Sequence, residues 1–216
     1  MQYENPFDVI NQDSASPIIF TVEHSGNSAP GMNFESDALM KKYDTGARDI
    51  AARLADTFQA FAIFGNYSRL MIDLNRELSI GLDVQEQTFA NEIWLPYHNR
   101  IQEKISGLMA AGITPIFISI HTMRESWPQD LAFLFDTDRR VSDFMQNKFA
   151  ESLPDIVVGM NEPFDANIVK GTLTINAEPL KLSAVEIEFN RRLLSDPEKL
   201  SRCIACIEDG IRNFTT

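Results

Sequence analysis

The sequence predicts a single α/β domain whose mostly parallel or mixed sheet is flanked by helices on both faces. Two observations predict this class. Short, continuous apolar runs are typical of strands buried on both faces, and amphipathic segments alternate with these runs along the chain. A length of 216 residues suits one domain over residues 1–216, and no repeat, low-complexity tract or Pro/Gly-rich linker divides the chain.

Six apolar runs predict strands, because each is short and bounded by polar or turn residues. They are residues 17–23, 69–75, 115–121, 131–136, 156–159 and 184–189. Four segments predict helices, because their apolar residues recur at steps of three and four. They begin near residue 44 and at about residues 90, 140 and 196. Residues 75–90 are expected to form a long loop that could be a lid, and residues 170–175 a hairpin-like segment.

The charge balance excludes several classes of partner. Lys and Arg total 19 against 31 Asp and Glu, a formal charge of −12, which repels nucleic-acid backbones and anionic lipid. Cys203 and Cys206 are too few for a disulfide framework, and their spacing is typical of two small core residues of one helix. With neither a secretory signal nor a spanning apolar segment, the expected location is the cytoplasm.

Two of the three histidines stand at the ends of predicted strands. His24 follows residues 17–23 and His121 ends residues 115–121. The carboxyl ends of parallel strands meet at one edge of a sheet, where ligands bind, and imidazole is a common zinc ligand. Each histidine could instead be a polar residue that closes its strand.

A hydrolytic zinc site needs a third ligand and a base. Asp44 could be the ligand or simply cap the following helix, and its spacing favours the cap. Asp73 lies inside a predicted strand, where a buried carboxylate needs a partner such as Arg69 or Arg76. Glu23 adjoins His24, and because side chains alternate between the faces of a strand, we expect Glu23 to point away from His24.

Glu186 and Glu188 share one face of a predicted strand, and Glu188, nearer its end, is the candidate base. An edge strand with a solvated polar face explains this pair equally well. Six arginines near these positions suggest a carboxylate-bearing substrate, although surface ion pairs would use them too. They are Arg48, Arg69, Arg76, Arg124, Arg191 and Arg192.

Seven motifs, in order, resemble the N-formylglutamate amidohydrolase family over residues 17–195. They are PIIFTVEHSG, YDTGARDIAARLA, SRLMIDLNR, PYHNRI, PIFISIHTM, VVGMNEPF and AVEIEFNRRLL. The resemblance implies a zinc-peptidase-like α/β fold and a metal-dependent hydrolase that removes an N-formyl or other small N-acyl group from an amino acid such as glutamate. A peptidase or cell-wall amidase on this fold, and a non-catalytic anion-binding protein that has lost the metal, are the alternatives.

The resemblance also implies roles for individual residues. His24, Asp44 and His121 would hold a divalent metal ion, with zinc expected, which reverses the preference for a cap at Asp44. Glu188 would be the general base, and Arg69 would stabilise the oxyanion. The expected partner is a small anionic N-acyl amino acid. The motifs place Asn75, Arg76 and Asn161 among the residues expected to bind it, and Arg124, from outside these motifs, is expected to join them.

Two departures from the family pattern lie in regions that would contact the substrate. Family members often carry a further histidine after the NEP element, and this chain has no histidine beyond His121. After the SIH motif, the segment TMRESWP brings Arg124 and Trp127 to the expected mouth of the pocket.

Overall fold

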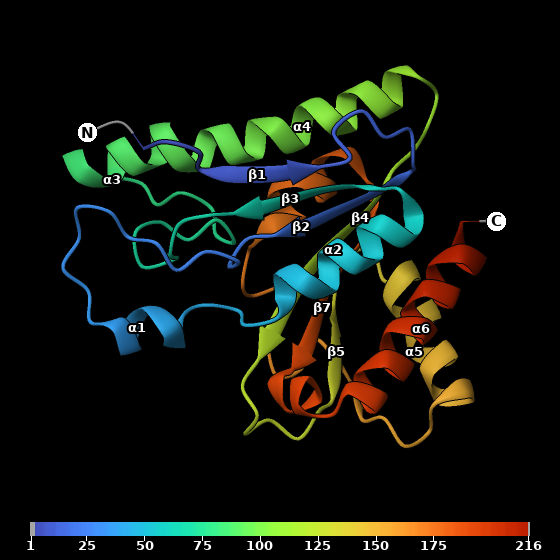
Figure 1. Ribbon diagram of the computed structural model, residues 1–216. Helices are drawn as coiled ribbons and strands as arrows, with labels where there is room; N and C mark the ends of the chain where they lie inside the picture. The colour runs from blue at the N-terminus through green and yellow to red at the C-terminus, as the bar shows by residue number, and fades with distance from the viewer. Residues whose placement is uncertain (1–2, 216) are drawn as a thin grey trace.

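The computed structural model describes residues 3–215 and contains one sheet with the strand order β1-β3-β2-β4-β7-β5-β6 (Figure 1). Its strands are β1 (Phe7–Ile10), β2 (Ile18–Val22), β3 (Phe61–Gly65), β4 (Ile116–Met123), β5 (Leu131–Leu134), β6 (Val158–Met160) and β7 (Ser183–Asn190). β3, β2, β4 and β7 are mutually parallel, whereas β1 and the β5–β6 pair run antiparallel to their neighbours β3 and β7. The sheet is therefore mixed, as predicted.

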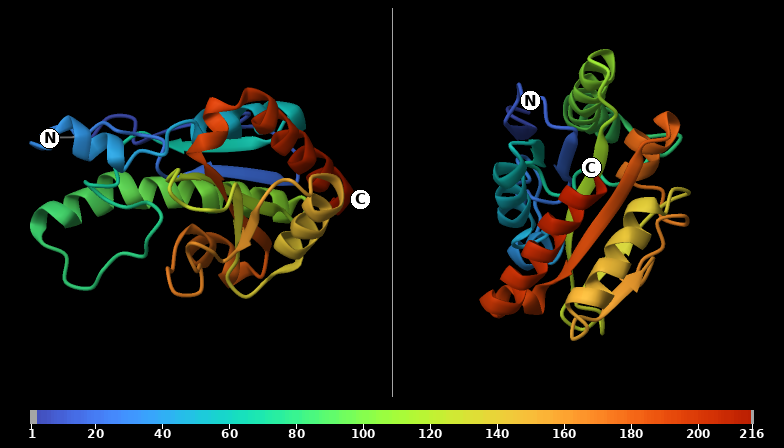
Figure 2. Two further views of the ribbon diagram at one scale, coloured as in Figure 1. Left: turned by 90° about the horizontal axis from the view of Figure 1, so that it is seen from below. Right: turned by 90° about the vertical axis from the view of Figure 1, so that its right-hand side faces the viewer.

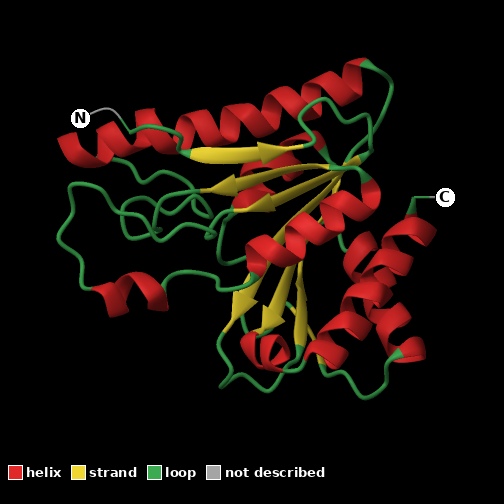
Figure 3. Ribbon diagram, in the orientation of Figure 1, coloured by secondary structure: helices red, strands yellow, loops and turns green. Residues whose placement is uncertain are grey.

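Helices cover both faces of the sheet (Figures 2 and 3). The α-helices are α1 (Ser36–Lys41), α2 (Ala47–Phe58), α3 (Val84–Phe89), α4 (Leu95–Ala110), α5 (Arg140–Ser152) and α6 (Pro197–Phe214). Helices α2, α5 and α6 pack in the core of one face, and α4 packs in the core of the other. A short π-helical segment, Leu173–Ala177, lies on the same face as α4.

Side chains of the central strands alternate between the two faces of the sheet, so each of these strands contributes to both hydrophobic cores. In β2, Ile18, Phe20 and Val22 belong to the α2 core and Ile19 to the α4 core, so all four are buried. The same alternation gives β7 one apolar face and one face with two glutamates. Val185 and Ile187 enter the α2 core, while Glu186 and Glu188 take the opposite face. β7 lies between β4 and β5, so it is not the edge strand of the alternative interpretation.

Three of the predicted elements are wrong, and one of them is the expected loop of residues 75–90, which contains α3. Residues 69–75 form turns, and the strand of that region is β3, eight residues earlier than expected at its start. The run is apolar because Met71 and Leu74 anchor the loop in the core, which requires no strand. Residues 170–175 lead into the π-helical segment rather than a hairpin. Strand β1 was not predicted.

The other predicted strands and helices are present within a few residues of their expected limits. Asp44 does not cap α2, because Gly46, with φ at 83°, occupies the N-cap position and no side chain caps that end. Among the described helices, none has the length and apolar character needed to cross a lipid bilayer.

Candidate metal centre

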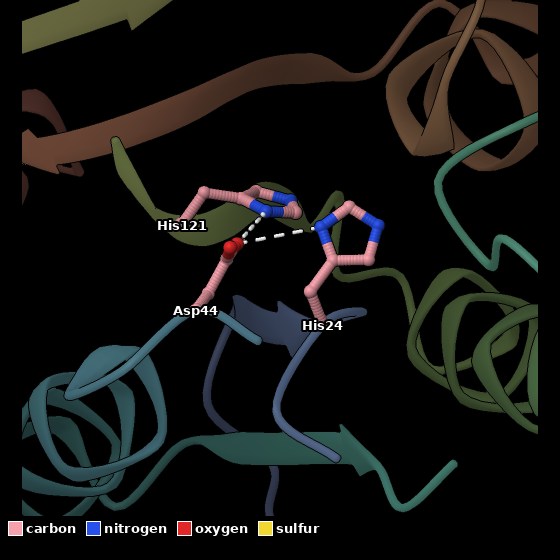
Figure 4. Close-up of side chains that lie close together, drawn as sticks. All are labelled: His24, Asp44 and His121. Atoms are coloured by element: carbon pink, nitrogen blue, oxygen red, sulfur yellow. Dashed lines mark hydrogen bonds and ion pairs between the residues drawn. The ribbon is translucent and has the colours of Figure 1, made fainter. Parts of the chain in front are cut away.

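His24, Asp44 and His121 converge at the carboxyl ends of β2 and β4 (Figure 4). Oδ2 of Asp44 lies 2.7 Å from Nδ1 of His121 and 3.3 Å from Nδ1 of His24. The backbone N–H of Asp44 donates to the carbonyl of His24, which fixes the carboxylate against the strand end. All three side chains are buried. The neighbouring positions of β2 and β4 in the sheet bring the two histidines together, as expected.

A second carboxylate lies behind each histidine. Nε2 of His24 is 2.7 Å from Oδ1 of Asp73, and Nε2 of His121 is 3.1 Å from Oε2 of Glu23. Arg69 in turn donates to Asp73 through Nε and Nη2. Carboxylates in this position fix the tautomer and orientation of metal-binding histidines.

Glu23 itself is held by further hydrogen bonds. It accepts from the hydroxyl of Ser119 at 2.6 Å and from that of Tyr97 at 3.4 Å. Glu23 does point away from His24, but toward His121 of the neighbouring strand, a contact that the sequence analysis did not predict. The pairing of Thr21 with Ser119 places Glu23 and His121 side by side, so knowledge of the strand order would have revealed it.

The donor set fits a divalent cation. If each Nε2–H donates to its carboxylate, both Nδ1 atoms carry lone pairs that face Asp44, an arrangement of acceptors only. Arg69 supports this tautomer for His24, because its Nη1, which can only donate, lies 3.3 Å from Nδ1. A proton on His121 would satisfy only its contact with Asp44. A bound cation would satisfy both imidazole nitrogens and the carboxylate oxygen at once. Two imidazole nitrogens and a carboxylate oxygen are the ligand types that zinc accepts.

Electrostatics in the cluster favour positive charge at this point. Burial lowers the pKa of His121, but Glu186, Asp44 and Glu23 outweigh burial and raise it well above the ordinary histidine value. Burial also raises the pKa of Asp44, but its contacts with the two histidines outweigh it, so the carboxylate stays ionised. The field that holds a proton on His121 would equally attract a metal ion.

Glu188 lies beside this cluster. In the β4–β7 ladder it pairs with His121, and its side chain is buried. Its Oε2 has no hydrogen-bond partner among the described residues. Burial raises the pKa of the Glu188 carboxyl to about 8; Asp44 and Glu186 add to this, while His121 and Arg69 oppose it. A carboxyl with a pKa near neutrality can take and return a proton, which suits a general base.

The cluster opens into a cavity of about 360 Å³. Four residues predicted to act there, Arg69, Asn75, Arg76 and Arg124, line it. Asn75 donates to Glu186 and accepts from the backbone N–H of Thr172, so its side chain is already held by the protein.

Other predicted residues lie elsewhere. The structure does not bring Asn161 to the cavity; its amide bonds the backbone N–H and C=O of Phe135, which fixes the loop after β6. Of the remaining arginines, Arg191 lines the cavity, whereas Arg48 and Arg192 pair with Asp8 and Asp130 outside it. The sequence analysis missed Lys41 and Lys42, which also line the cavity.

Comparisons with known proteins concern the family and the fold. A family model described as N-formylglutamate amidohydrolase matches residues 81–195. A gene product of Agrobacterium tumefaciens is 22% identical, with a TM-score of 0.88 over 97% of this chain and 93% of that one. An N-formylglutamate amidohydrolase from Ralstonia eutropha is 15% identical, with a TM-score of 0.72 over 96% of this chain and 98% of that one. At these identities the structures show a shared fold. No curated protein is significantly similar in sequence.

Proposed function

Because the chain belongs to the N-formylglutamate amidohydrolase family and is therefore a hydrolase of linear amides, we propose that it removes an N-formyl or other small N-acyl group from an amino acid in a metal-dependent reaction. The observation that carries the proposal is the convergence of His24, Asp44 and His121 beside the buried, unpaired oxygen of Glu188. A non-catalytic binding protein, the alternative, would not need three potential metal ligands beside a buried carboxylate.

The metal would be held by His24, Asp44 and His121, and zinc is the expected ion. When bound, such an ion supplies a Lewis acid that polarises the acyl oxygen and makes water easier to deprotonate. Asp73 and Glu23 keep the two imidazole rings oriented through their Nε2 atoms.

Glu188 performs the proton transfers. Its carboxylate accepts a proton from the attacking water as the water oxygen bonds to the acyl carbon. The protonated Glu188 then gives that proton to the amide nitrogen as the C–N bond breaks. The remaining water proton passes from the acid product to the released amine, so the products are a carboxylate, which is formate for a formyl substrate, and an amino acid with a protonated amine. Arg69, fixed by Asp73, donates to the negative charge that develops on the acyl oxygen.

The amino-acid carboxylate is bound by basic residues of the cavity. Arg76 lines it and donates through Nη1 to the carbonyl of Asn75, which orients its guanidinium. A guanidinium recognises a carboxylate with two parallel hydrogen bonds. Replacement of Arg76 by Ala should therefore raise KM more than it lowers kcat, and an unchanged KM would contradict this role.

The first test is metal content. We expect about one zinc ion per chain in protein purified without chelator, lost in His24→Ala and in His121→Ala. His98→Gln is the matched control, because His98 is an equally buried histidine that bonds the carbonyl of Leu74 outside the cluster. It should retain the metal. Wild-type protein that binds no zinc even after its addition would refute the proposal.

The second test separates the base from the metal ligands. Glu188→Gln should keep zinc but lose activity on N-formylamino acids by about 10²- to 10⁴-fold, the usual contribution of general acid–base catalysis. Release of the free amine from N-formylglutamate and N-formylglycine measures the rate. Full activity in Glu188→Gln would exclude this residue as the base, and zinc-loaded wild type inactive on every N-acyl amino acid would refute the activity.

A further inference from the structure

We propose that the cavity selects N-acyl amino acids that carry one carboxylate and one large apolar group, such as a phenyl ring, over those that carry two carboxylates. This inference rests on the proposed function and names the substrate class. The group would bind an apolar wall that no catalytic role explains. The residues of this wall are Met123, Trp127, Leu134, Phe164, Ala166 and Val169.

The buried part of the apolar wall belongs to a small hydrophobic cluster. Met123, Leu134 and Ala166 pack with Ala132 in a buried group that is separate from the two main cores. Met123 ends β4, Leu134 ends β5, and Ala166 lies in the loop after β6. Three different elements thus contribute apolar side chains to one side of the cavity.

The rim of the wall is aromatic and open to water. The rings of Trp127 and Phe164 lie edge to face, with centroids 6.1 Å apart, and each residue is 37% exposed. The Trp127 segment is held in place, because its backbone carbonyl accepts from both Asn190 and Arg192. A fixed aromatic pair above an apolar floor exposes hydrophobic surface that a ligand of matching character would cover.

The strand order separates this wall from two of the arginines. Arg69 and Arg76 lie in the loop after β3 near Asp73, whose carboxylate contacts His24 at the end of β2. Leu134 and the loop after β6 lie on the β5–β6 side. His121 and the two glutamates lie between them, on β4 and β7. The cavity therefore has a basic side, a central reacting group and an apolar side.

A substrate whose amide lies over Glu188 meets both sides. Its carboxylate faces the basic loop, so the group on the opposite side meets the apolar wall. A second carboxylate there would lose its hydration with few donors to replace water, which is costly. Arg124 follows Met123 at the border of this wall and forms no ion pair with any described residue, and Arg191, Lys41 and Lys42 also line the cavity. These cations provide the rival interpretation, in which an acidic side chain is recognised.

The apolar group could belong to either end of the amide. It could be the side chain of the amino acid, as in N-formylphenylalanine, or an acyl group larger than the small ones of the proposed function, as in N-phenylacetylglycine. Both present the same chemistry to Trp127 and Phe164, and a comparison of the two substrates distinguishes them.

The experiment compares kcat/KM of the zinc-loaded enzyme for the two phenyl substrates, N-formylglycine and N-formylglutamate. We expect at least one phenyl substrate to exceed both others by roughly 10- to 100-fold, the usual worth of burying such a group. In Trp127→Ala and Phe164→Ala the ratio of that substrate to N-formylglycine should fall by about 10-fold. Met109→Ala, which removes an exposed apolar side chain of α4 outside the cavity, is the matched control and should keep the ratio.

A binding measurement supplies a readout that does not depend on turnover. Addition of phenylalanine or phenylacetate to chelator-treated protein should change tryptophan fluorescence at lower concentrations than glutamate does, and Trp127→Leu should abolish the change. A preference for N-formylglutamate over both phenyl substrates, or equal rates for all four substrates, would overturn the inference and leave the proposed function standing. A fluorescence response without any hydrolysis would overturn the proposed function and keep the apolar site.

Discussion

Replacement of Glu23 by Gln tests whether the carboxylates behind the histidines set the metal affinity. Glu23 is completely buried, and its Oε2 lies 3.1 Å from Nε2 of His121. Gln has the same shape, and its oxygen can still accept from both His121 and Ser119, which contact one oxygen of Glu23, while its amide N–H can donate to the Tyr97 hydroxyl at the other position. The substitution therefore removes mainly the negative charge that makes His121 a stronger donor of electrons to a metal.

The expected cost is a 10- to 100-fold loss of zinc affinity, which is the usual effect of changing such a partner. This range corresponds to about 1.4–2.8 kcal/mol. Competition for zinc against a chromophoric chelator at neutral pH measures the affinity, and circular dichroism verifies that the variant is folded. Glu23→Ala should cost more, because it also leaves His121 without an acceptor.

The control is a buried carboxylate outside the site. Asp130 is bonded by Arg192 and Lys199 and lies outside the metal cluster, so Asp130→Asn should lower stability without changing zinc affinity. Wild-type affinity in folded Glu23→Gln would refute the reasoning. Equal losses in Glu23→Gln and Asp130→Asn would trace the effect to general destabilisation.

Three further predictions concern packing and titration. A Cβ at Gly171 would lie 2.4 Å from Oδ1 of Asn75, so Gly171→Ala should lower the free energy of unfolding by about 1–3 kcal/mol in urea, whereas Gly107→Ala, with open space in α4, should raise it slightly. Burial raises the pKa of Asp130, but its bonds to Val157 N–H, Lys199 and Arg192 outweigh this and lower it. Its contribution to stability is then present above the ordinary carboxyl pKa and lost as pH falls through the lowered value, so the stability difference between wild type and Asp130→Asn should shrink in acid; a constant difference would contradict this. Burial raises the pKa of the Cys203 thiol to about 12, so iodoacetamide should label it at mildly alkaline pH only after unfolding, as mass spectrometry can detect.

The sequence alone predicted those features that depend on local pattern and on parallel topology. His24 and His121 follow strands, and the carboxyl ends of neighbouring parallel strands must meet at one edge, so their proximity was predictable. Asp44 was ambiguous, because a helix cap and a metal ligand can stand at the same spacing. Only the family resemblance favoured the ligand, and its role there remains a prediction.

The features that were not predicted depend on contacts between distant segments. The apolar run of residues 69–75 resembles a strand because a loop that anchors itself in the core needs the same residues. The contact of Glu23 with His121 crosses from β2 to β4, and periodicity within one strand carries no information about its neighbour. The apolar wall of the cavity likewise forms only when β4, β5 and the loop after β6 come together.

The pairing of His121 with Glu188 in the β4–β7 ladder also bears on how this protein can evolve. The separation of these two positions is set by main-chain hydrogen bonds, which substitutions of side chains leave intact. A slip of one residue would put Ile187 in place of Glu188, so intermediate arrangements are not available. Segments at the two flanks of the cavity can therefore diversify freely, and new substrates can be acquired there without rebuilding the reacting centre.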